Sequence, residues 1–393
     1  MDKIEELLTR GVEKIIPSKE ELEKVLRSGK KLRIYQGFDP TSPEFHIGHM
    51  VGLRKLRQWQ DLGHEVIFLI GDFTGRIGDP TGKDKTRVPL TKAQVLENAK
   101  TYKEQAAKIL RFEGENAVKI KHNSEWLDKI PAPELIRLTS FLTFQQVIER
   151  DMFQRRLSEN KDISISEFLY PFMQGYDSVE MDVDVEVGGN DQLFNMMTGR
   201  DLMHKIKKKN KFVMTTPLLT DSEGKKIGKT EGNVIALTEK PEILYSQIMA
   251  LPDDIITKGF EYLTDVPMEE IEEIKKSLKN GENPVASKKK LAFEIVKQLN
   301  SEKEAEAAAE NFRKIVQDKE TPLNIVSIKV EDETTVSDAI LKMEFASSKS
   351  EVKRLAEQKG ITLNGKTIEG IDQKISEGIL KVGKKKFVKI TKI

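Results

Sequence analysis

Two short segments of the chain carry side chains that can bind a polyphosphate. The first, the histidine signature, is His46-Ile47-Gly48-His49, and the second, the lysine signature, is Lys226-Ile227-Gly228-Lys229-Thr230. Histidines at a helix start add imidazole donors to backbone N–H groups and to the positive end of the helix dipole. Lysines on a loop can close on the same phosphates and stabilise the charge that develops there. Together the two segments predict nucleotidyl transfer.

A third loop, residues 74–87, adds further candidates for the same site. Here Lys83 and Arg87 are predicted phosphate contacts, and Asp79 can accept hydrogen bonds from an ammonium group. Gly48 of the histidine signature removes a side chain where a nucleotide would press close. Each segment alone has an ordinary alternative, a chance helix start, half a metal site or a solvated lysine turn. The prediction therefore depends on their combination.

These residues need a parallel sheet to bring them together. The stretch 32–35 predicts a strand, the helical spacing that follows His46 predicts a helix ending at Gly63, and the apolar stretch 65–70 predicts a buried strand. Strand, helix and strand form a βαβ unit with a right-handed crossover. Ligands bind at the carboxyl ends of such strands. We therefore expect the histidine signature at that edge of the sheet.

The remaining patterns complete the expected layout of the chain. We expect amphipathic helices over residues 2–15 and 18–29, mostly helix over 92–175, a strand with one acidic face over 181–187, and Asp191 as the cap of the following helix. Five consecutive helices follow, over residues 241–250, 253–263, 268–279, 284–299 and 301–316. A linker is expected over 317–333. Helices near Val336 and after Ser348, an Asn364-Gly365 hairpin and short basic strands come last.

Composition limits the classes of protein that are possible. Of the 393 residues 38% are hydrophobic and none is cysteine, which fits an ordinary globular protein in a reducing compartment. No run of 18 apolar residues appears, so we expect no membrane span and a cytoplasmic protein. Residues 334–393 hold 13 Lys or Arg and 7 Asp or Glu. This basic tail predicts a polyanion-binding module or a solubilising surface.

The assembled segments resemble the class I aminoacyl-tRNA synthetases, and most closely the tyrosine-specific enzymes of bacterial type. Nearly the whole chain takes part in the resemblance. It rests on residues 35–41, both signatures, Gly78-Asp79-Pro80, the pattern Tyr170-x-x-x-Gln174-x-x-Asp177, and residues 188–192. The tail from about Val336 is similar to the S4-type RNA-binding domain. Leu193 stands where many relatives carry an aromatic residue, and Gln36 where some carry cysteine.

The resemblance implies an α/β fold and three domains. These are a Rossmann-type catalytic domain with a helical insertion over 1–225, a lysine-signature loop and α-helical anticodon-side domain over 226–325, and a linker with a small α+β S4-like domain over 326–393. In the implied reaction the tyrosine carboxylate attacks the α-phosphate of ATP and releases pyrophosphate, and the tyrosyl group is then transferred from the adenylate to the terminal adenosine of tRNA(Tyr). It also implies Mg²⁺ with the ATP, a homodimer, and no structural metal.

The resemblance further implies roles for individual residues. Tyrosine would be bound by Tyr35, Asp79, Tyr170, Gln174 and Asp177, with Tyr35 and Asp177 at its phenol. The adenylate and ATP would contact Asp39, Gly48, Gly189, Asp191 and Gln192. The catalytic set would be Thr41, His46, His49, Lys83, Arg87, Lys226, Lys229 and Thr230. The tRNA would contact Lys349, Lys353, Arg354, Lys384, Lys385 and Lys386.

Three other functions share some of these features. A tryptophan-specific synthetase has the same signatures, but the pairing of Tyr35 with Asp177 and the tail argue against it. A small-metabolite nucleotidyltransferase or adenylate-forming ligase gives no reason for the helical domain and basic tail. A non-catalytic RNA-binding relative would not need both signatures intact.

Overall fold

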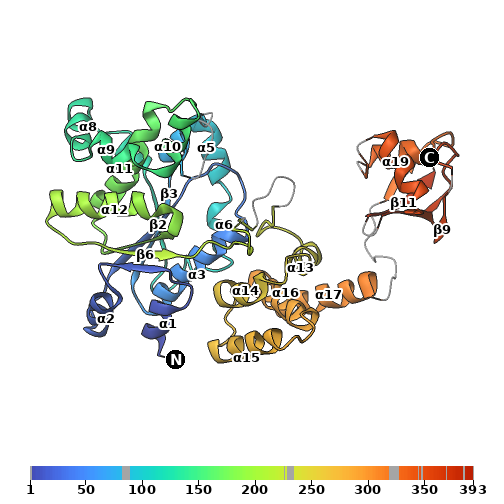
Figure 1. Cartoon of the computed structure of the whole chain (residues 1–393), viewed down its shortest axis with the longest axis horizontal. Helices are drawn as coiled ribbons and strands as arrows, with labels where there is room; N and C mark the ends of the chain where they lie inside the picture. The colour runs from blue at the N-terminus through green and yellow to red at the C-terminus, as the bar shows by residue number, and fades with distance from the viewer. Residues whose placement is uncertain are drawn as a thin grey trace. The chain divides into compact units, whose positions relative to one another are not determined.

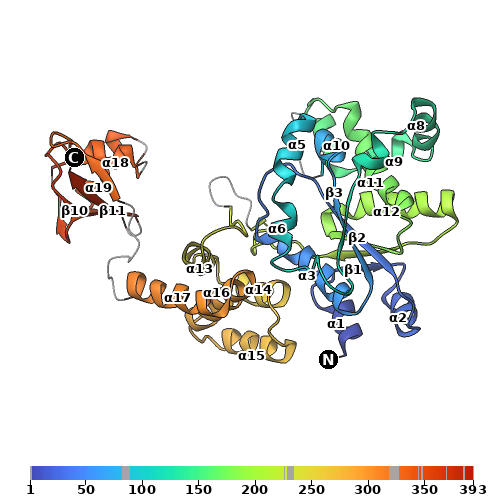
Figure 2. The same ribbon diagram turned by 180° about the vertical axis from the view of Figure 1, so that it is seen from behind.

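The computed structural model describes residues 2–81, 89–224, 226–227, 234–317, 327–343, 345–346, 348–368, 370–383 and 386–392. The chain divides into two compact units, Met1–Glu306 and Ala307–Ile393, which Figures 1 and 2 draw from opposite sides. In the described part of the chain, no helix is long and apolar enough to cross a membrane.

A six-stranded sheet forms the centre of the larger unit, with the strand order β1-β6-β5-β2-β3-β4. Its strands are β1 (Lys14–Ile16), β2 (Arg33–Phe38), β3 (Glu65–Ile70), β4 (Lys119–His122), β5 (Val185–Gly189) and β6 (Phe212–Thr216). All neighbours are parallel except β1, which is antiparallel to β6. The chain leaves β2 toward β3 and β4 on one side and returns to β5 on the other. The predicted α/β class is confirmed, and the order reverses at β2, which is where such sheets bind ligands.

The helix α3 (Ile47–Asp61) makes the crossover between β2 and β3, as the sequence predicts. Its buried side chains include Met50, Leu53 and Leu56, spaced three apart on one face. The helix ends before Gly63, whose φ of 82° lies in the region that favours glycine. Because α3 begins directly after the turn that follows β2, its N-terminus lies at the carboxyl edge of the sheet.

The expectation of one helix over residues 2–15 is wrong beyond Thr9. Helix α1 (Lys3–Thr9) ends before Gly11, which has a φ of 60°, and the chain then forms the edge strand β1. The unpaired edge of β6 takes up β1, and this long-range pairing overrides the helical spacing. Helix α2 (Lys19–Arg27) does begin after Ser18, whose hydroxyl accepts from the Glu21 N–H.

The region between β3 and β5 is mostly helical, as predicted, but it also contains the missed strand β4. Its helices are α4 (Thr74–Ile77), α5 (Lys92–Ala99), α6 (Tyr102–Ala106), α7 (Ser124–Leu127), α8 (Ala132–Thr139), α9 (Phe144–Ile148), α10 (Asp151–Ser158) and α11 (Ile165–Glu180). In Figure 1, α8 to α11 gather at the end of the unit opposite α1 and α2. The strand expected from Met181 begins only at Val185, because α11 continues to Glu180 and Asp182 has a φ of 48°.

After β5 the chain forms α12 (Leu193–Leu202) and a π-helical turn (Met203–Lys207) before β6. Five helices then follow in the ranges expected: α13 (Pro241–Met249), α14 (Ile255–Leu263), α15 (Met268–Lys279), α16 (Val285–Leu299) and α17 (Glu302–Phe312). The guanidinium groups of Arg10 and Arg54 both donate to the carbonyl oxygen of Thr264, at the end of α14. Buried cations at a helix C-terminus stabilise the helix. Because Arg54 lies on α3, its hydrogen bond also holds α14 against α3.

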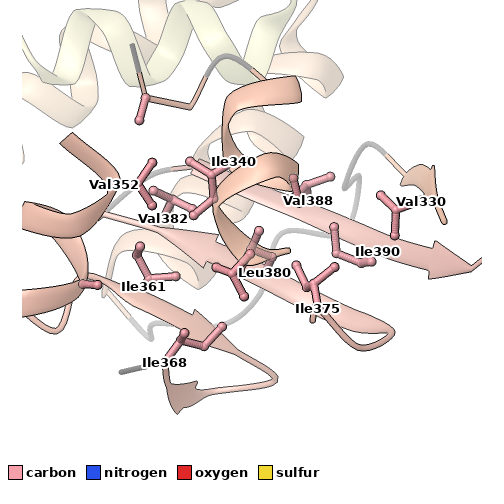
Figure 3. Packing of buried hydrophobic residues seen from close by; sticks show 14 residues of the cluster. Val330, Ile340, Val352, Ile361, Ile368, Ile375, Leu380, Val382, Val388 and Ile390 are labelled. Atoms are coloured by element: carbon pink, nitrogen blue, oxygen red, sulfur yellow. The ribbon is translucent and has the colours of Figure 1, made fainter. Parts of the chain in front are cut away.

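The smaller unit contains a five-stranded sheet with the order β7-β11-β10-β8-β9. Its elements are β7 (Ser327–Val330), α18 (Val336–Lys342), α19 (Lys349–Glu357), β8 (Ile361–Leu363), β9 (Lys366–Thr367), β10 (Gly378–Val382) and β11 (Lys386–Lys392). Figure 3 shows Ile340, Val352, Leu380 and other buried apolar side chains gathered between the helices and the sheet. The linker expected over 317–333 is wrong at β7, which pairs in parallel with β11.

Candidate active site

A cavity of about 510 Å³ lies at the carboxyl edge of the larger sheet. It is lined by the ends of β2, β5 and β6, the start of α3, and one face of α11. Of the predicted site residues, those that line it are Tyr35, Asp39, Thr41, His46, Gly48, His49, Asp79, Tyr170, Gln174, Asp177, Gly189, Asp191, Gln192 and Lys226. The predictions for Lys83, Arg87, Lys229, Thr230, Lys384 and Lys385 lie outside the described residues. The predicted RNA contacts Lys349, Lys353, Arg354 and Lys386 belong to the smaller unit.

The two signature histidines are fixed by the backbone at the start of α3. The His46 Nδ1 accepts from the Gly48 N–H at 3.1 Å, and the His49 Nδ1 accepts from the His46 N–H at 3.1 Å. Their ring centroids are 3.9 Å apart. Because Nδ1 of each ring is an acceptor, each neutral imidazole carries its proton on Nε2. Both rings are therefore oriented as N–H donors.

Gly48, within the histidine signature, lies between the His46 ring and the start of the lysine signature. A Cβ atom at this position would lie 2.9 Å from Cε1 of His46 and 3.8 Å from the carbonyl oxygen of Ile227. A contact of 2.9 Å is closer than two carbon atoms can approach without a shift, so only glycine fits beside the fixed His46 ring. The same distances place the backbone of the lysine signature directly over the start of α3.

Backbone hydrogen bonds hold the start of the lysine signature and the segment that follows it. On the N-terminal side the Ile227 N–H donates to the Leu219 carbonyl at 2.8 Å. On the C-terminal side the Ile47 N–H donates to the Ile235 carbonyl at 2.9 Å, and Leu237 pairs with Phe45. The Nζ of Lys226 reaches Asp191 Oδ2 at 2.7 Å. Segments far apart in the sequence thus meet over one cavity. Asp191 therefore pairs with a lysine, whereas its predicted role as a helix cap is wrong.

One end of the cavity presents a buried carboxylate and a buried phenol. Asp177 is 2% exposed, and its two oxygens accept from Trp126 Nε1 at 2.8 Å and from Asn123 Nδ2 at 3.2 Å. Burial raises the pKa of Asp177 well above its ordinary value, although these two hydrogen bonds oppose the rise. The Tyr35 hydroxyl lies 2.8 Å from Ser178 Oγ, and burial also raises the pKa of Tyr35. This end can form hydrogen bonds in both directions with a hydroxyl group.

The middle of the cavity carries two more carboxylates. Asp39 accepts from the Tyr170 hydroxyl at 2.8 Å, and Asp79 accepts from Gln192 Nε2 at 2.6 Å. Gln174 donates to Glu186 at 3.1 Å. Negative charge on this part of the wall suits an ammonium group.

Several residues of the site gave no signal in the sequence. Asn123 and Trp126 hold Asp177, and both follow β4, a strand of mostly polar residues that the pattern did not predict. Glu186 was expected on an acidic face but is 2% exposed and forms an ion pair with Lys211. An isolated carboxylate is costly to bury, so its partner determines where it lies.

Comparison with known proteins identifies the family and agrees with the fold. A family model described as class I tRNA synthetases (W and Y) matches residues 27–317. A C-terminally truncated mitochondrial tyrosyl-tRNA synthetase of Aspergillus nidulans superposes with a TM-score of 0.67 at 26% identity, covering 80% of this chain and 94% of that one. The chain therefore belongs to the class I tRNA synthetases.

Curated relatives narrow the family further. A tyrosine–tRNA ligase of Thermotoga maritima is 44% identical over 390 residues, which cover 98% of this chain and 96% of that protein. A tyrosine–tRNA ligase of Aquifex aeolicus is 41% identical over 389 residues, with 98% and 97% covered. Within its class, the chain belongs to the tyrosine–tRNA ligases rather than to the tryptophan-specific branch.

Proposed function

We propose that the cavity activates L-tyrosine with ATP, forming tyrosyl-adenylate and pyrophosphate, and that the chain then transfers the tyrosyl group to the 3′-terminal adenosine of tRNA(Tyr). One observation carries the proposal. A single cavity joins a buried Tyr35 and Asp177 at one end to the two signature histidines and Lys226 at the other. The first end suits the phenol of tyrosine, and the second suits the phosphates of ATP.

Tyrosine would lie along the wall formed by β2 and α11. Asp177, as the carboxylate, accepts the proton of the substrate phenol, and Tyr35 donates to the phenol oxygen. Phenylalanine would leave both groups buried without a partner, which penalises its binding. The α-ammonium group would be bound by Asp79, Tyr170 and Gln174, which line the middle of the cavity.

ATP would occupy the edge formed by the turn after β2, the start of α3 and the end of β5. The adenosine and the adenylate would contact Asp39, Gly48, Gly189, Asp191 and Gln192. The leaving pyrophosphate would be held by Thr41, His46, His49, Lys83, Arg87, Lys226, Lys229 and Thr230. No general base is needed, since the substrate carboxylate is already ionised at neutral pH. Catalysis would come from positioning and from positive charge where negative charge develops.

Mg²⁺ would enter with ATP rather than occupy a fixed site. This ion keeps several waters and binds through phosphate oxygens with one or two carboxylates. The lining carboxylates Asp39 and Asp191 offer such oxygens. Among the residues that the structure describes, no group of three or more His, Asp or Glu side chains could hold a metal ion.

The smaller unit would be the S4-like RNA-binding module, with the domain boundaries expected at 225 and 325. Lys349 and Lys353 are exposed and lie four residues apart on α19, next to the exposed Arg354. Residues with this spacing share one face of a helix. Lys386, at the start of β11, is also exposed. With Lys384 and Lys385, these cations would bind the tRNA backbone.

The proposed assembly is a homodimer. Its proposed location is the cytoplasm, where ATP and tRNA occur together. Four large, exposed apolar side chains support a dimer interface on α8 to α11. They are Ile136, Phe144, Leu157 and Ile165, which are 71%, 63%, 52% and 80% exposed. Exposed apolar side chains gathered on one region commonly mark a protein interface. Sedimentation of the full chain should give twice the mass of one chain, and a monomer at micromolar concentration would contradict the proposal.

Exchange of labelled pyrophosphate into ATP, run with each of the twenty amino acids, tests the function. We expect exchange with tyrosine and none with tryptophan or phenylalanine. Exchange with tryptophan alone would mean a tryptophan-specific enzyme, and exchange with no amino acid would mean a different nucleotidyl transfer or a non-catalytic RNA-binding protein.

Deletion of residues 334–393 separates the two steps. Adenylate formation should stay within about twofold of the full chain, whereas tRNA charging should fall at least about a hundredfold, because phosphate contacts supply much of the affinity for RNA. Equal loss of both activities would mean that the tail is not a separate RNA-binding module.

A further inference from the structure

A buried polar chain lies directly behind the tyrosine end of the cavity. It consists of Lys211, Glu186, Ser178 and Tyr35, which are 0%, 2%, 0% and 1% exposed. Lys211 directly precedes β6, and the others lie on β5, α11 and β2. Tyr35 and Glu186 line the cavity, whereas Lys211 and Ser178 are not among its lining residues. These four polar side chains therefore support the wall of the cavity from the inside of the protein.

The two oxygens of Glu186 connect the lysine to the ammonium end of the substrate site. Oε2 accepts from the Nζ of Lys211, and Oε1 accepts from Gln174 Nε2 at 3.1 Å. The other end of the Gln174 amide accepts from Asn195 Nδ2 at 3.1 Å. With both ends bonded, the amide has one orientation. Glu186 thus fixes which group Gln174 presents to the cavity.

Ser178 connects the same lysine to the phenol end. Its Oγ accepts from Lys211 Nζ at 2.9 Å, so its own proton must go to another acceptor. The Tyr35 oxygen lies at 2.8 Å and Glu186 Oε2 at 3.4 Å, and the shorter contact favours Tyr35. A Ser178 hydroxyl that donates to Tyr35 leaves the Tyr35 O–H to point into the cavity. The ammonium group of Lys211 has three hydrogens, so it can donate to Glu186 and to Ser178 at the same time.

We propose that Lys211 and Glu186 form a positioning pair for substrate tyrosine: Lys211 acts through Ser178 to make Tyr35 a donor to the substrate phenol, and Glu186 orients Gln174 toward the ammonium group. The proposal rests on the function proposed above. It explains how the phenol oxygen meets a donor from Tyr35 while the phenol proton meets the acceptor Asp177. A donor and an acceptor that both bind the phenol hydroxyl select tyrosine over phenylalanine.

Gly199 on α12 leaves space for the side chain of Lys211. A Cβ atom at Gly199 would lie 2.6 Å from Lys211 Nζ and 3.0 Å from Ser178 Oγ. The glycine is therefore required for the ammonium group to reach Ser178. Because burying a charged pair costs free energy that an apolar pair would not, stability alone gives no reason for an ion pair here.

Two variants test the pair without leaving an unpaired buried charge. Ser178→Ala removes the connection to Tyr35 and keeps the ion pair, and the double variant Lys211→Met with Glu186→Gln removes both charges. Loss of one hydrogen bond predicts that each raises the KM for tyrosine about three- to tenfold and lowers the tyrosine-over-phenylalanine ratio of kcat/KM by a similar factor. The KM for ATP should stay within about twofold. A purely structural role would change stability without this selective effect on tyrosine.

A matched control lies just before the strands β5 and β6. Asp184 and Lys209 form an ion pair at 3.1 Å, two residues before Glu186 and Lys211 respectively, and neither lines the cavity. The double variant Lys209→Met with Asp184→Asn should leave both KM values and the discrimination ratio unchanged. An equal effect of this control and the Lys211 variant would overturn the proposal.

The unmodified chain, assayed alongside, separates the two hypotheses. If it exchanges pyrophosphate with tyrosine while Ser178→Ala keeps its KM and discrimination within twofold, the positioning role is wrong and the proposed function stands. If the unmodified chain gives no exchange with tyrosine, the proposed function fails first. Circular dichroism checks that each variant is folded. If the double variant is unfolded, Ser178→Ala alone decides.

Discussion

Replacing Trp126 with phenylalanine removes one donor from the carboxylate proposed to recognise the phenol. Trp126 Nε1 donates to Asp177 Oδ1 at 2.8 Å, whereas Asn123 donates to the other oxygen at 3.2 Å. Trp126→Phe keeps an aromatic ring and deletes the shorter of these two bonds. The direct consequence is weaker stabilisation of the ionised Asp177.

The size of the effect follows from the kind of bond that is lost. A hydrogen bond to a charged group contributes about 1.5–3 kcal/mol, and about 1.4 kcal/mol corresponds to a factor of ten. We therefore expect kcat/KM for tyrosine to fall about ten- to a hundredfold. The KM for ATP should change by less than about twofold, since the bond lies at the opposite end of the cavity from the histidine signature.

The pH profile gives an independent readout with a definite sign. Burial raises the pKa of Asp177 and the Trp126 bond lowers it, so deletion of that bond raises the pKa further. Only the carboxylate accepts the proton of the substrate phenol, and activity is lost as the pH falls through this pKa. The acidic limb of kcat/KM for tyrosine should therefore move to higher pH in Trp126→Phe.

The only other tryptophan of the chain supplies the control. Trp59 is fully buried on α3, and its Nε1 has no hydrogen-bond partner among the described residues. Trp59→Phe should lower stability through lost packing and leave the tyrosine kinetics unchanged. If Trp126→Phe shows the same KM for tyrosine and the same acidic limb as the unmodified protein, the assigned role of Asp177 is refuted.

Three further substitutions test other parts of the structure. Gly48→Ala places a Cβ 2.9 Å from His46 Cε1, so kcat/KM for ATP should fall about a hundredfold in pyrophosphate exchange; unchanged ATP kinetics would contradict a fixed His46. Burial lowers the pKa of Lys55 to about 7. Between pH 7 and about 10 the folded state therefore holds fewer protons than the unfolded state. The free energy of unfolding then rises with pH by up to about 1.4 kcal/mol per pH unit. Lys55→Met should remove that rise in urea unfolding measured at pH 7 and 9.5, and an unaltered slope would mean that burial does not lower the pKa of Lys55. Arg156→Met leaves Glu167 buried without its ion-pair partner and should cost about 3–5 kcal/mol of unfolding free energy, whereas adding Glu167→Gln should recover most of it; an equal loss in both variants would mean that packing, not charge, is responsible.

Local patterns predicted the elements whose spacing extends over several turns. The helix after His46 and the five helices from Pro241 onward lie where their apolar periodicity and caps indicate. The strands β1, β4 and β7 were missed, since each is only three or four residues long. Such short strands exist because a neighbouring strand offers an unpaired edge, which no local pattern reveals.

The site residues also separate into those that could be proposed from the sequence and those that could not. His46, Lys226 and Asp79 could be proposed from the sequence, because their types and neighbours suit phosphates and an ammonium group, and the role of Asp177 was implied by the resemblance to the class I synthetases. Their partners could not, since Asp177 meets Asn123 only where β4 joins the sheet.

By itself the sequence determined which side chains are available to this protein: two signatures with donors for phosphates, the side chains proposed to bind tyrosine, and the order of the elements that carry them. These depend on residue type and on spacings of a few positions, which govern local hydrogen bonding. Only the tertiary structure decided which charges are buried together, such as Lys211 with Glu186 behind Tyr35. That choice depends on desolvation and packing among segments far apart in the chain, and a buried charge is stable only where the fold brings its partner.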